Sequence, residues 1–145
     1  MTFALHSRLE QDTTVIGDFP LCRVLLSKED IGPWLILVPK IDNLREIHHL
    51  PHEQQIQLIS ESSAVASILE SSTNADKINI GALGNMVPQL HIHHIARFKN
   101  DIAWPGPVWG NTQGIQRGKE AQEEVCAKWR DQLSKVEGFI PANSQ

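Results

Sequence analysis

The sequence predicts an α+β fold in which helices cover an antiparallel sheet. Two apolar runs, residues 21–26 and 34–38, are joined by a short charged turn that ends in Gly-Pro, as is typical of a β-hairpin. Two other segments, residues 51–71 and 125–136, carry apolar side chains at helical spacing. The order of strands, helix, strands and helix is that of an α+β domain.

The elements follow from local signals. The run 34–38 is apolar on both faces and is therefore expected to be a central strand, which Pro39 ends. Pro51 suits the first position of a helix, where its missing N–H costs nothing. Asn74 and Asp76 interrupt the helical pattern, and residues 77–81 form a short strand.

The second half begins with a loop bracketed by Gly81 and Gly84, and Pro88 then opens a strand rich in histidine. The segment AWPGPVWG (103–110) is irregular, and an amphipathic helix follows it. We expect residues 1–137 to form a single domain and residues 138–145 to form a flexible tail.

Composition limits the class of protein. The chain has 145 residues, 41% hydrophobic and 21% charged, which fits one soluble globular domain. The net charge of −4 and the lack of a basic run argue against a nucleic-acid partner. Two cysteines, no signal-peptide pattern and no apolar run near the roughly 20 residues of a membrane span indicate a cytoplasmic protein without a membrane partner.

Three of the seven histidines lie within four positions, in QLHIHHIAR (89–97). Side chains alternate across a strand, so His91 and His93 share one face with Gln89, and His94 falls on the opposite, otherwise apolar face. A lone histidine is more often structural than catalytic. Two in phase can share one ligand, so His91 and His93 are the candidate pair.

The pair suits two kinds of chemistry. His-x-His can supply two zinc ligands, but zinc needs three or four, and only distant histidines could complete the set: His6, His48, His49 and His52. Alternatively, a neutral imidazole attacks phosphorus and forms a covalent phosphohistidine, while the second imidazole donates to a phosphate oxygen. Donors for a developing negative charge lie upstream at Asn79, Gly81, Gly84 and Asn85.

The stretch KINIGALGNMVPQLHIHHIAR (77–97), with WLILVPK (34–40) upstream, resembles the histidine triad (HIT) family of nucleotide hydrolases and nucleotidyl transferases. The family pattern is His-x-His-x-His followed by two apolar positions. The resemblance covers residues 21–97 and implies a HIT-like fold with a sheet of about five strands, a central helix and a C-terminal helix. AWPGPVWG and the final helix also resemble a bacterial branch similar to diadenosine tetraphosphate hydrolases.

The resemblance implies roles for residues. In register, His91 is the catalytic nucleophile that forms a nucleotidyl-histidine, and the catalytic His93 binds phosphate oxygens. Asn79 and Asn85 would contact phosphate, and the backbone carbonyl of Gln89, at the first triad position, would orient the nucleophile. The resemblance further implies a phosphoanhydride or phosphoramidate substrate, no resident metal, no required cofactor beyond Mg²⁺ bound with the substrate, and a homodimer joined across a sheet edge.

Several positions depart from the family pattern. Gln89 replaces an imidazole, Met86 stands where some members have a small hydroxyl residue, and Ser27 stands where an acidic residue often holds the ribose. His94 occupies a normally apolar position, and we interpret it as a structural histidine with a partner on the far face. Arg97 is expected to form a surface ion pair rather than to meet a distal phosphate.

Trp104 and Trp109 flank a Pro-Gly-Pro turn and either cover a nucleobase or pack an irregular loop. Three functions remain open. The first is a nucleotide hydrolase or transferase that uses His91. The second is a nucleotide-binding module without turnover, suggested by Gln89 and Met86, and the third is a histidine metal site.

Overall fold

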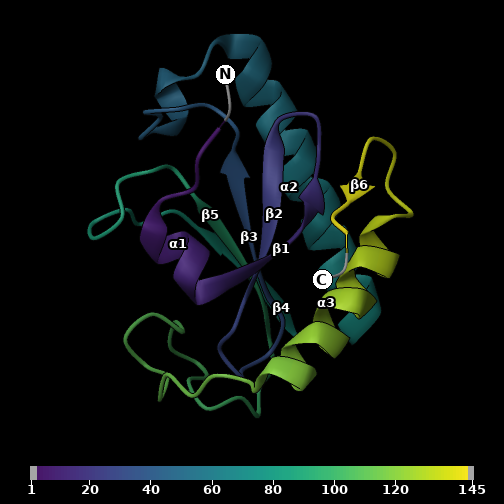
Figure 1. Ribbon diagram of the computed structural model, residues 1–145. Helices are drawn as coiled ribbons and strands as arrows, with labels where there is room; N and C mark the ends of the chain where they lie inside the picture. Colours follow the sequence, from purple (N-terminus) through teal and green to yellow (C-terminus); the bar gives the residue numbers. More distant parts are fainter. Residues whose placement is uncertain (1–2, 144–145) are drawn as a thin grey trace.

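A six-stranded antiparallel sheet in the order β4-β5-β3-β2-β1-β6 forms the centre of the molecule in the computed structural model, which describes residues 3–143 (Figure 1). The strands are β1 (Thr13–Asp18), β2 (Cys22–Ser27), β3 (Trp34–Pro39), β4 (Lys77–Gly81), β5 (Ile92–Arg97) and β6 (Ile140–Pro141). The helices are α1 (Ser7–Asp12), α2 (His52–Thr73) and α3 (Lys119–Leu133), with a 3-10 turn at Ile47–His49. The predicted α+β class, with a central and a C-terminal helix on an antiparallel sheet, is confirmed.

The predicted hairpin is β2 and β3, which pair antiparallel with Val24 opposite Leu37 at the middle of the sheet. Every residue of β3 is buried, as its apolar composition on both faces requires. Helix α2 starts one residue later than predicted, because Pro51 is its N-cap rather than its first residue. Asn74 ends it in the left-handed conformation (φ 55°), which asparagine tolerates better than most residues.

The sheet has six strands rather than about five because β1 and β6 add to its edge. A register shift between Val15 and Gly17 breaks the alternation of β1, which hides this strand from pattern reading. Gly17 is required where β6 crosses, since a Cβ there would lie 2.4 Å from the carbonyl oxygen of Ile140.

Residues 138–143 pack on the sheet rather than extending from it as a tail. Phe139 is buried, with its ring 5.2 Å from that of Phe19, and this contact draws β6 onto β1. The remaining two positions of the expected tail, 144 and 145, lie outside the described residues.

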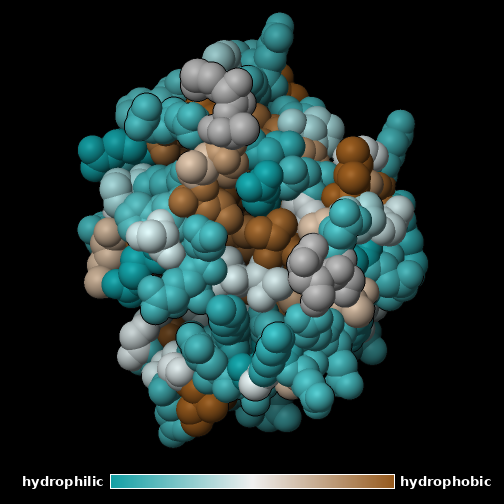
Figure 2. All heavy atoms as spheres, viewed as in Figure 1, coloured by the Kyte–Doolittle hydropathy of each residue, from teal (hydrophilic) through white to brown (hydrophobic). Residues whose placement is uncertain are grey.

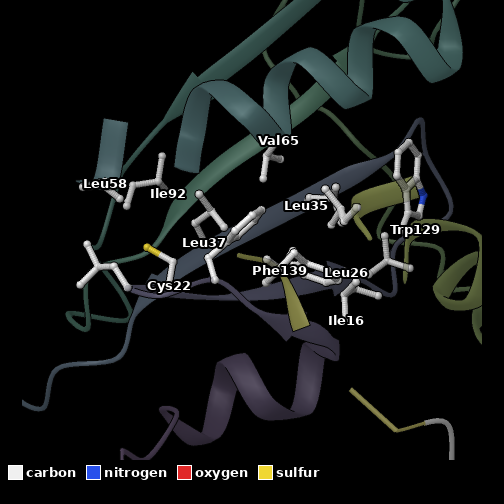
Figure 3. Packing of buried hydrophobic residues seen from close by; sticks show 14 of the residues in the cluster. Ile16, Cys22, Leu26, Leu35, Leu37, Leu58, Val65, Ile92, Trp129 and Phe139 are labelled. Atoms are coloured by element: carbon white, nitrogen blue, oxygen red, sulfur yellow. The ribbon is translucent and has the colours of Figure 1, made fainter. Parts of the chain in front are cut away.

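The sheet buries a different core on each face. The larger core lies between the sheet and helices α2 and α3, with Val65 and Trp129 packed against strand residues (Figure 3). The smaller core includes Leu9 of α1, Trp34 and Val108, and the partly buried Ile31 and Val87 pack against it, so the short helix α1 and several loops cover that face. Figure 2 shows an apolar area near the centre of an otherwise mostly hydrophilic surface. The sparsely covered face leaves room for a cavity.

Within residues 3–143, every helix is too short or too polar to cross a lipid bilayer.

Candidate functional site

Strand β5 carries the histidines and lies between β3 and β4, so the sheet fixes its backbone on both sides. His93 is opposite Ile36 of β3 and Gly81 of β4, whereas His94 is opposite Leu35 and Ile80. His91 precedes the first residue of β5 and continues the same alternation. The predicted separation of His91 and His93 from His94 is therefore what the register shows.

His91 and His93 line a common cavity of about 290 Å³ on the sparsely covered face. The other walls come from α1 and the start of β1, from the end of β2 and its following turn, from β3, and from the loops that carry Val87 and residues 114–116. They comprise Arg8, Leu9, Asp12, Thr13, Ser27, Glu29, Trp34, Ile36, Val87, Gly114 and Gln116. The ring centroids of His91 and His93 are 5.0 Å apart, so both imidazoles reach one small group in the cavity.

The His91 ring is oriented by the backbone. Its Nδ1 lies 2.7 Å from the carbonyl oxygen of Gln89. A carbonyl accepts and never donates, so Nδ1 carries the proton in this hydrogen bond. The neutral ring then has its lone pair on Nε2. This is the state that a nucleophilic imidazole needs.

His93 is enclosed by two indoles. Its ring centroid is 5.6 Å from that of Trp34 and 5.4 Å from that of Trp109, both in edge geometry. Trp34 Nε1 donates to His93 Nδ1 at 2.9 Å. Burial lowers the pKa of His93 to about 3, with smaller contributions from His91 and His94, so the ring is neutral at physiological pH.

His94 has the structural role that the sequence predicts. It is fully buried on the opposite face of the sheet, where its Nδ1 donates to the carbonyl oxygen of Ile92 at 3.0 Å. The hydroxyl of Ser62 on α2 lies 2.7 Å from its Nε2. Burial lowers the pKa of His94 to about 4. The interpretation of His94 as a histidine with a partner on the far face is confirmed.

Gln89 bonds through its side chain to the N-terminal segment. Its Oε1 accepts from the backbone N–H of His6 at 2.8 Å, and its Nε2 donates to the carbonyl of Ala4 at 3.0 Å. The segment leads directly into α1, which walls the cavity with Arg8 and Leu9. The Gln89 amide thus both accepts and donates a hydrogen bond, and it fastens the chain leading to α1 beside the start of β5.

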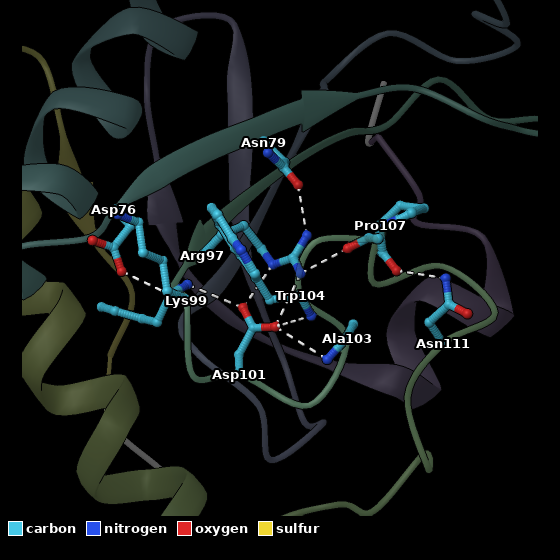
Figure 4. Close-up of polar contacts among 11 residues, drawn as sticks. Asp76, Asn79, Arg97, Lys99, Asp101, Ala103, Trp104, Pro107 and Asn111 are labelled. Atoms are coloured by element: carbon cyan, nitrogen blue, oxygen red, sulfur yellow. Dashed lines mark hydrogen bonds and ion pairs between the residues drawn. The ribbon is translucent and has the colours of Figure 1, made fainter.

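The prediction of a surface ion pair for Arg97 is wrong, because the guanidinium is buried. Arg97 Nε lies 2.8 Å from Asp101 Oδ2, with the two side chains 2% and 9% exposed. The guanidinium also donates to Asn79 Oδ1 and to the carbonyl of Gly106, both at 2.8 Å, and stands 5.8 Å from the Trp104 ring (Figure 4). The loop after β5 folds back over the end of that strand and covers Arg97. The alternation of polar and apolar residues along β5 does not indicate this.

This buried network anchors the loop that brings Trp109 to the site. Trp104 packs on Arg97, as expected of an irregular loop, whereas Trp109 lies against His93. Hydrogen bonds from Arg97, together with its positive charge, hold the pKa of Asp101 well below its usual range. Gly81 is needed beneath the loop, since a Cβ there would lie 2.9 Å from the Trp109 ring.

The structure gathers only some of the predicted residues. Ser27 lines the cavity with the two histidines, and its Oγ accepts from the backbone N–H of Glu29 at 3.2 Å. Asn79, Asn85 and the side chain of Gln89 are not among the cavity walls. The side-chain oxygen Oδ1 of Asn79 accepts a hydrogen bond from Arg97, and Asn85 is exposed.

Other cavity residues were missed from the sequence. Arg8 and Asp12 belong to α1, whose six residues are too few to show a period. Glu29 lies two positions after Ser27 in the charged turn, and this proximity in sequence indicates a place in the same site. Its Oε1 is buried without a hydrogen-bond partner in the described part of the chain. Over residues 3–143, no group of three or more His, Cys, Asp or Glu side chains has an arrangement that could hold a metal ion.

Comparison with known proteins identifies a shared domain. The HIT domain model matches residues 8–100. A histidine triad protein from Marinobacter aquaeolei VT8 is 47% identical, with a TM-score of 0.88 over 94% of this chain and 99% of that one. One from Bradyrhizobium japonicum is 45% identical (TM-score 0.86; 92% and 99%), and one from Sinorhizobium meliloti 1021 is 43% identical (TM-score 0.85; 90% and 97%). The comparison with curated proteins yields no match.

The buried histidines make stability depend on pH. The folded pKa values of His93 and His94 are lowered, so below the ordinary value of about 6.5 the unfolded chain binds more protons than the folded one. Stability should therefore fall as pH drops from about 7 to about 5, by about 2 kcal/mol for each histidine. Urea unfolding at both pH values measures this loss.

The double variant His94→Val with Ser62→Ala removes both side chains of the hydrogen bond between Ser62 and His94, so neither group is left buried without the other. Its loss of stability between the two pH values should be about 2 kcal/mol smaller than that of the wild type. Equal losses would show that His94 is not held neutral.

Removing the amide of Gln89 should release the N-terminal segment without disturbing His91. In Gln89→Leu, the backbone N–H of His6 loses its acceptor, and its hydrogen exchange should accelerate by roughly three- to tenfold. Gln89→Glu keeps an acceptor for that N–H and should accelerate exchange less. Amide hydrogen exchange followed by NMR distinguishes the two variants. An unchanged exchange rate of the His6 N–H in Gln89→Leu would refute the role of Gln89 in holding the N-terminal segment.

Proposed function

Because the chain belongs to the HIT domain family, we propose that it is a nucleotide hydrolase or nucleotidyl transferase whose nucleophile is His91. The observation that carries the proposal is the 2.7 Å contact between Nδ1 of His91 and the Gln89 carbonyl, which leaves the Nε2 lone pair free in a cavity shared with His93. Gln89 supplies this contact through its backbone, so the lost imidazole does not remove the orienting group.

The reaction proceeds in two displacements. The Nε2 lone pair of His91 attacks the α-phosphorus, an N–P bond forms, and the bond from phosphorus to the bridging oxygen or nitrogen breaks. The leaving group departs with that electron pair and takes a proton from solvent. Water then attacks the phosphorus, the N–P bond returns its electrons to His91, and the water proton passes to solvent. The products are a nucleoside monophosphate and the leaving group.

The substrate lies with its α-phosphate between His91 and His93 and its sugar toward Ser27 and Glu29. The unpartnered Glu29 oxygen suits a ribose hydroxyl, which is a hydrogen-bond donor. The phosphate contacts predicted for Asn79 and Asn85 stay part of this proposal, although neither residue is among the cavity walls. A cavity of about 290 Å³ is near the lower end of small-molecule sites, so it takes the nucleotidyl half and leaves the rest outside.

The bond class is a phosphoanhydride or a phosphoramidate, as in a dinucleoside polyphosphate such as diadenosine tetraphosphate, or in adenosine phosphoramidate. No resident cofactor is needed for the two displacements. Mg²⁺ enters with a polyphosphate substrate, where it neutralises charge on the leaving group.

Turnover assays test the function. Wild type should release AMP from one or both substrate types, and His91→Ala should lower kcat by about 10³-fold or more because the nucleophile is gone. His52→Ala, which removes an exposed histidine outside the cavity, should leave turnover unchanged. Chelation with EDTA should slow polyphosphate cleavage more than phosphoramidate cleavage.

Three results would contradict the proposal. Equal turnover in wild type and His91→Ala would exclude His91 as the nucleophile. Saturable AMP binding without turnover of any substrate would instead identify a nucleotide-binding module, and stoichiometric transition metal in the purified protein would point to a metal site.

We also propose a homodimer that forms across the outer edge of β4. Within the described residues this strand pairs only with β5, and three large apolar side chains are exposed on it and its following loop: Ile80, Leu83 and Met86, at 52%, 53% and 78%. An uncovered edge strand with apolar neighbours is a surface for pairing. Sedimentation velocity should give twice the chain mass for wild type and the single mass for Leu83→Glu; a monomeric wild type would contradict the dimer.

A further inference from the structure

The two site histidines are held by partners of opposite character. We propose that the indole of Trp34 is a positioning residue that fixes His93 as the Nε2–H tautomer, opposite to that of His91. The cavity then presents one lone pair and one N–H to the same ligand. The tautomer itself does not depend on the reaction, but its use on a phosphoryl group rests on the proposed function.

The tautomer of His93 follows from the chemistry of its partner. An indole N–H can only donate, and Trp34 Nε1 lies 2.9 Å from Nδ1 of His93. Nδ1 must therefore accept, so the proton of the neutral ring is on Nε2. The carbonyl of Gln89 can only accept, so the proton of His91 is on Nδ1. The indole N–H can only donate and the Gln89 carbonyl can only accept, so together they assign the tautomers of both imidazole rings.

The position of Trp34 is fixed by the fold. It is the first residue of β3, opposite Ile95 of β5, and the residue is 9% exposed within the smaller core. Trp109 lies against His93 as well, with ring centroids 5.4 Å apart. The imidazole thus has two aromatic neighbours in edge geometry, which restrict its rotation away from the indole N–H.

The same hydrogen bond disfavours a charged His93. Protonation of Nδ1 would bring two N–H donors together, which adds to the burial that already keeps this ring neutral. His93 therefore acts as a neutral donor. An N–H at Nε2 stabilises a phosphate oxygen as negative charge grows on it, whereas a lone pair in that place would repel the oxygen. The lone pair of His91 thus faces the electrophilic phosphorus, and the N–H of His93 faces one of its anionic oxygens.

NMR on the ¹⁵N-labelled protein tests the assignment without substrate. Long-range ¹H–¹⁵N correlations should show His91 protonated at Nδ1 and His93 at Nε2. A scalar coupling between the Trp34 and His93 nitrogens across the hydrogen bond should be present in wild type, so the test does not depend on a variant that folds. Protonation of His93 at Nδ1 would overturn the proposal.

Trp34→Phe keeps an aromatic ring and removes the donor. His93 should then populate both tautomers, and kcat should fall about tenfold or more while KM changes less than about threefold, because the lost interaction acts on the transition state. Trp129→Phe is the matched control: this buried indole has no hydrogen-bond partner in the described residues and is not a cavity wall, so neither readout should change.

The two proposals fail separately. A wild type with the assigned tautomers but no turnover would refute the hydrolase and leave the role of Trp34 intact. Turnover in Trp34→Phe equal to that of wild type, with His93 still protonated at Nε2, would refute the positioning role and leave the hydrolase intact.

Discussion

The hydrogen bond between Nδ1 of His91 and the carbonyl of Gln89 is the interaction on which the site depends. A carbonyl has no proton to give, so this contact selects one tautomer and directs the Nε2 lone pair into the cavity. The carbonyl itself is held because residues 89–91 run directly into β5, which is paired on both sides. A side chain in the same role would rotate, and it would titrate if it were an imidazole. The backbone does neither.

The rest of the molecule holds this arrangement in place. His94 joins the same strand to α2 through Ser62, on the face that carries the larger core. Arg97 at the end of the strand binds Asp101 and so anchors the loop that carries Trp109 to His93. Interactions at these positions stabilise the fold and orient the site at once. Gln89 adds a further connection, since its side chain holds the segment that leads into α1.

Alternation along one strand predicted much of the site, because a period of two residues is fixed by backbone geometry. It separated His91 and His93 from His94, and the buried run 34–38 was recognised as a central strand. Contacts that join distant parts of the chain gave no such signal. The partner of the Gln89 amide lies 83 residues away at His6. Arg97 is predicted at the surface, because the sequence of its strand does not indicate the loop that folds over it. Strand β1 is not predicted, because its bulge disrupts the two-residue alternation of side chains. The function assigned to the pair rests on the family and on this local geometry together.

Mapping the covalent adduct is the sharpest test of His91 as the nucleophile. Wild-type protein mixed with substrate, quenched in alkali within a turnover and digested, should yield a peptide with a nucleotidyl group whose fragmentation places it on His91. A nucleophilic His91 gives this single site, and the adduct is absent from His91→Ala. An adduct on His93 or His94, or turnover that proceeds with no adduct at any time point, would contradict it.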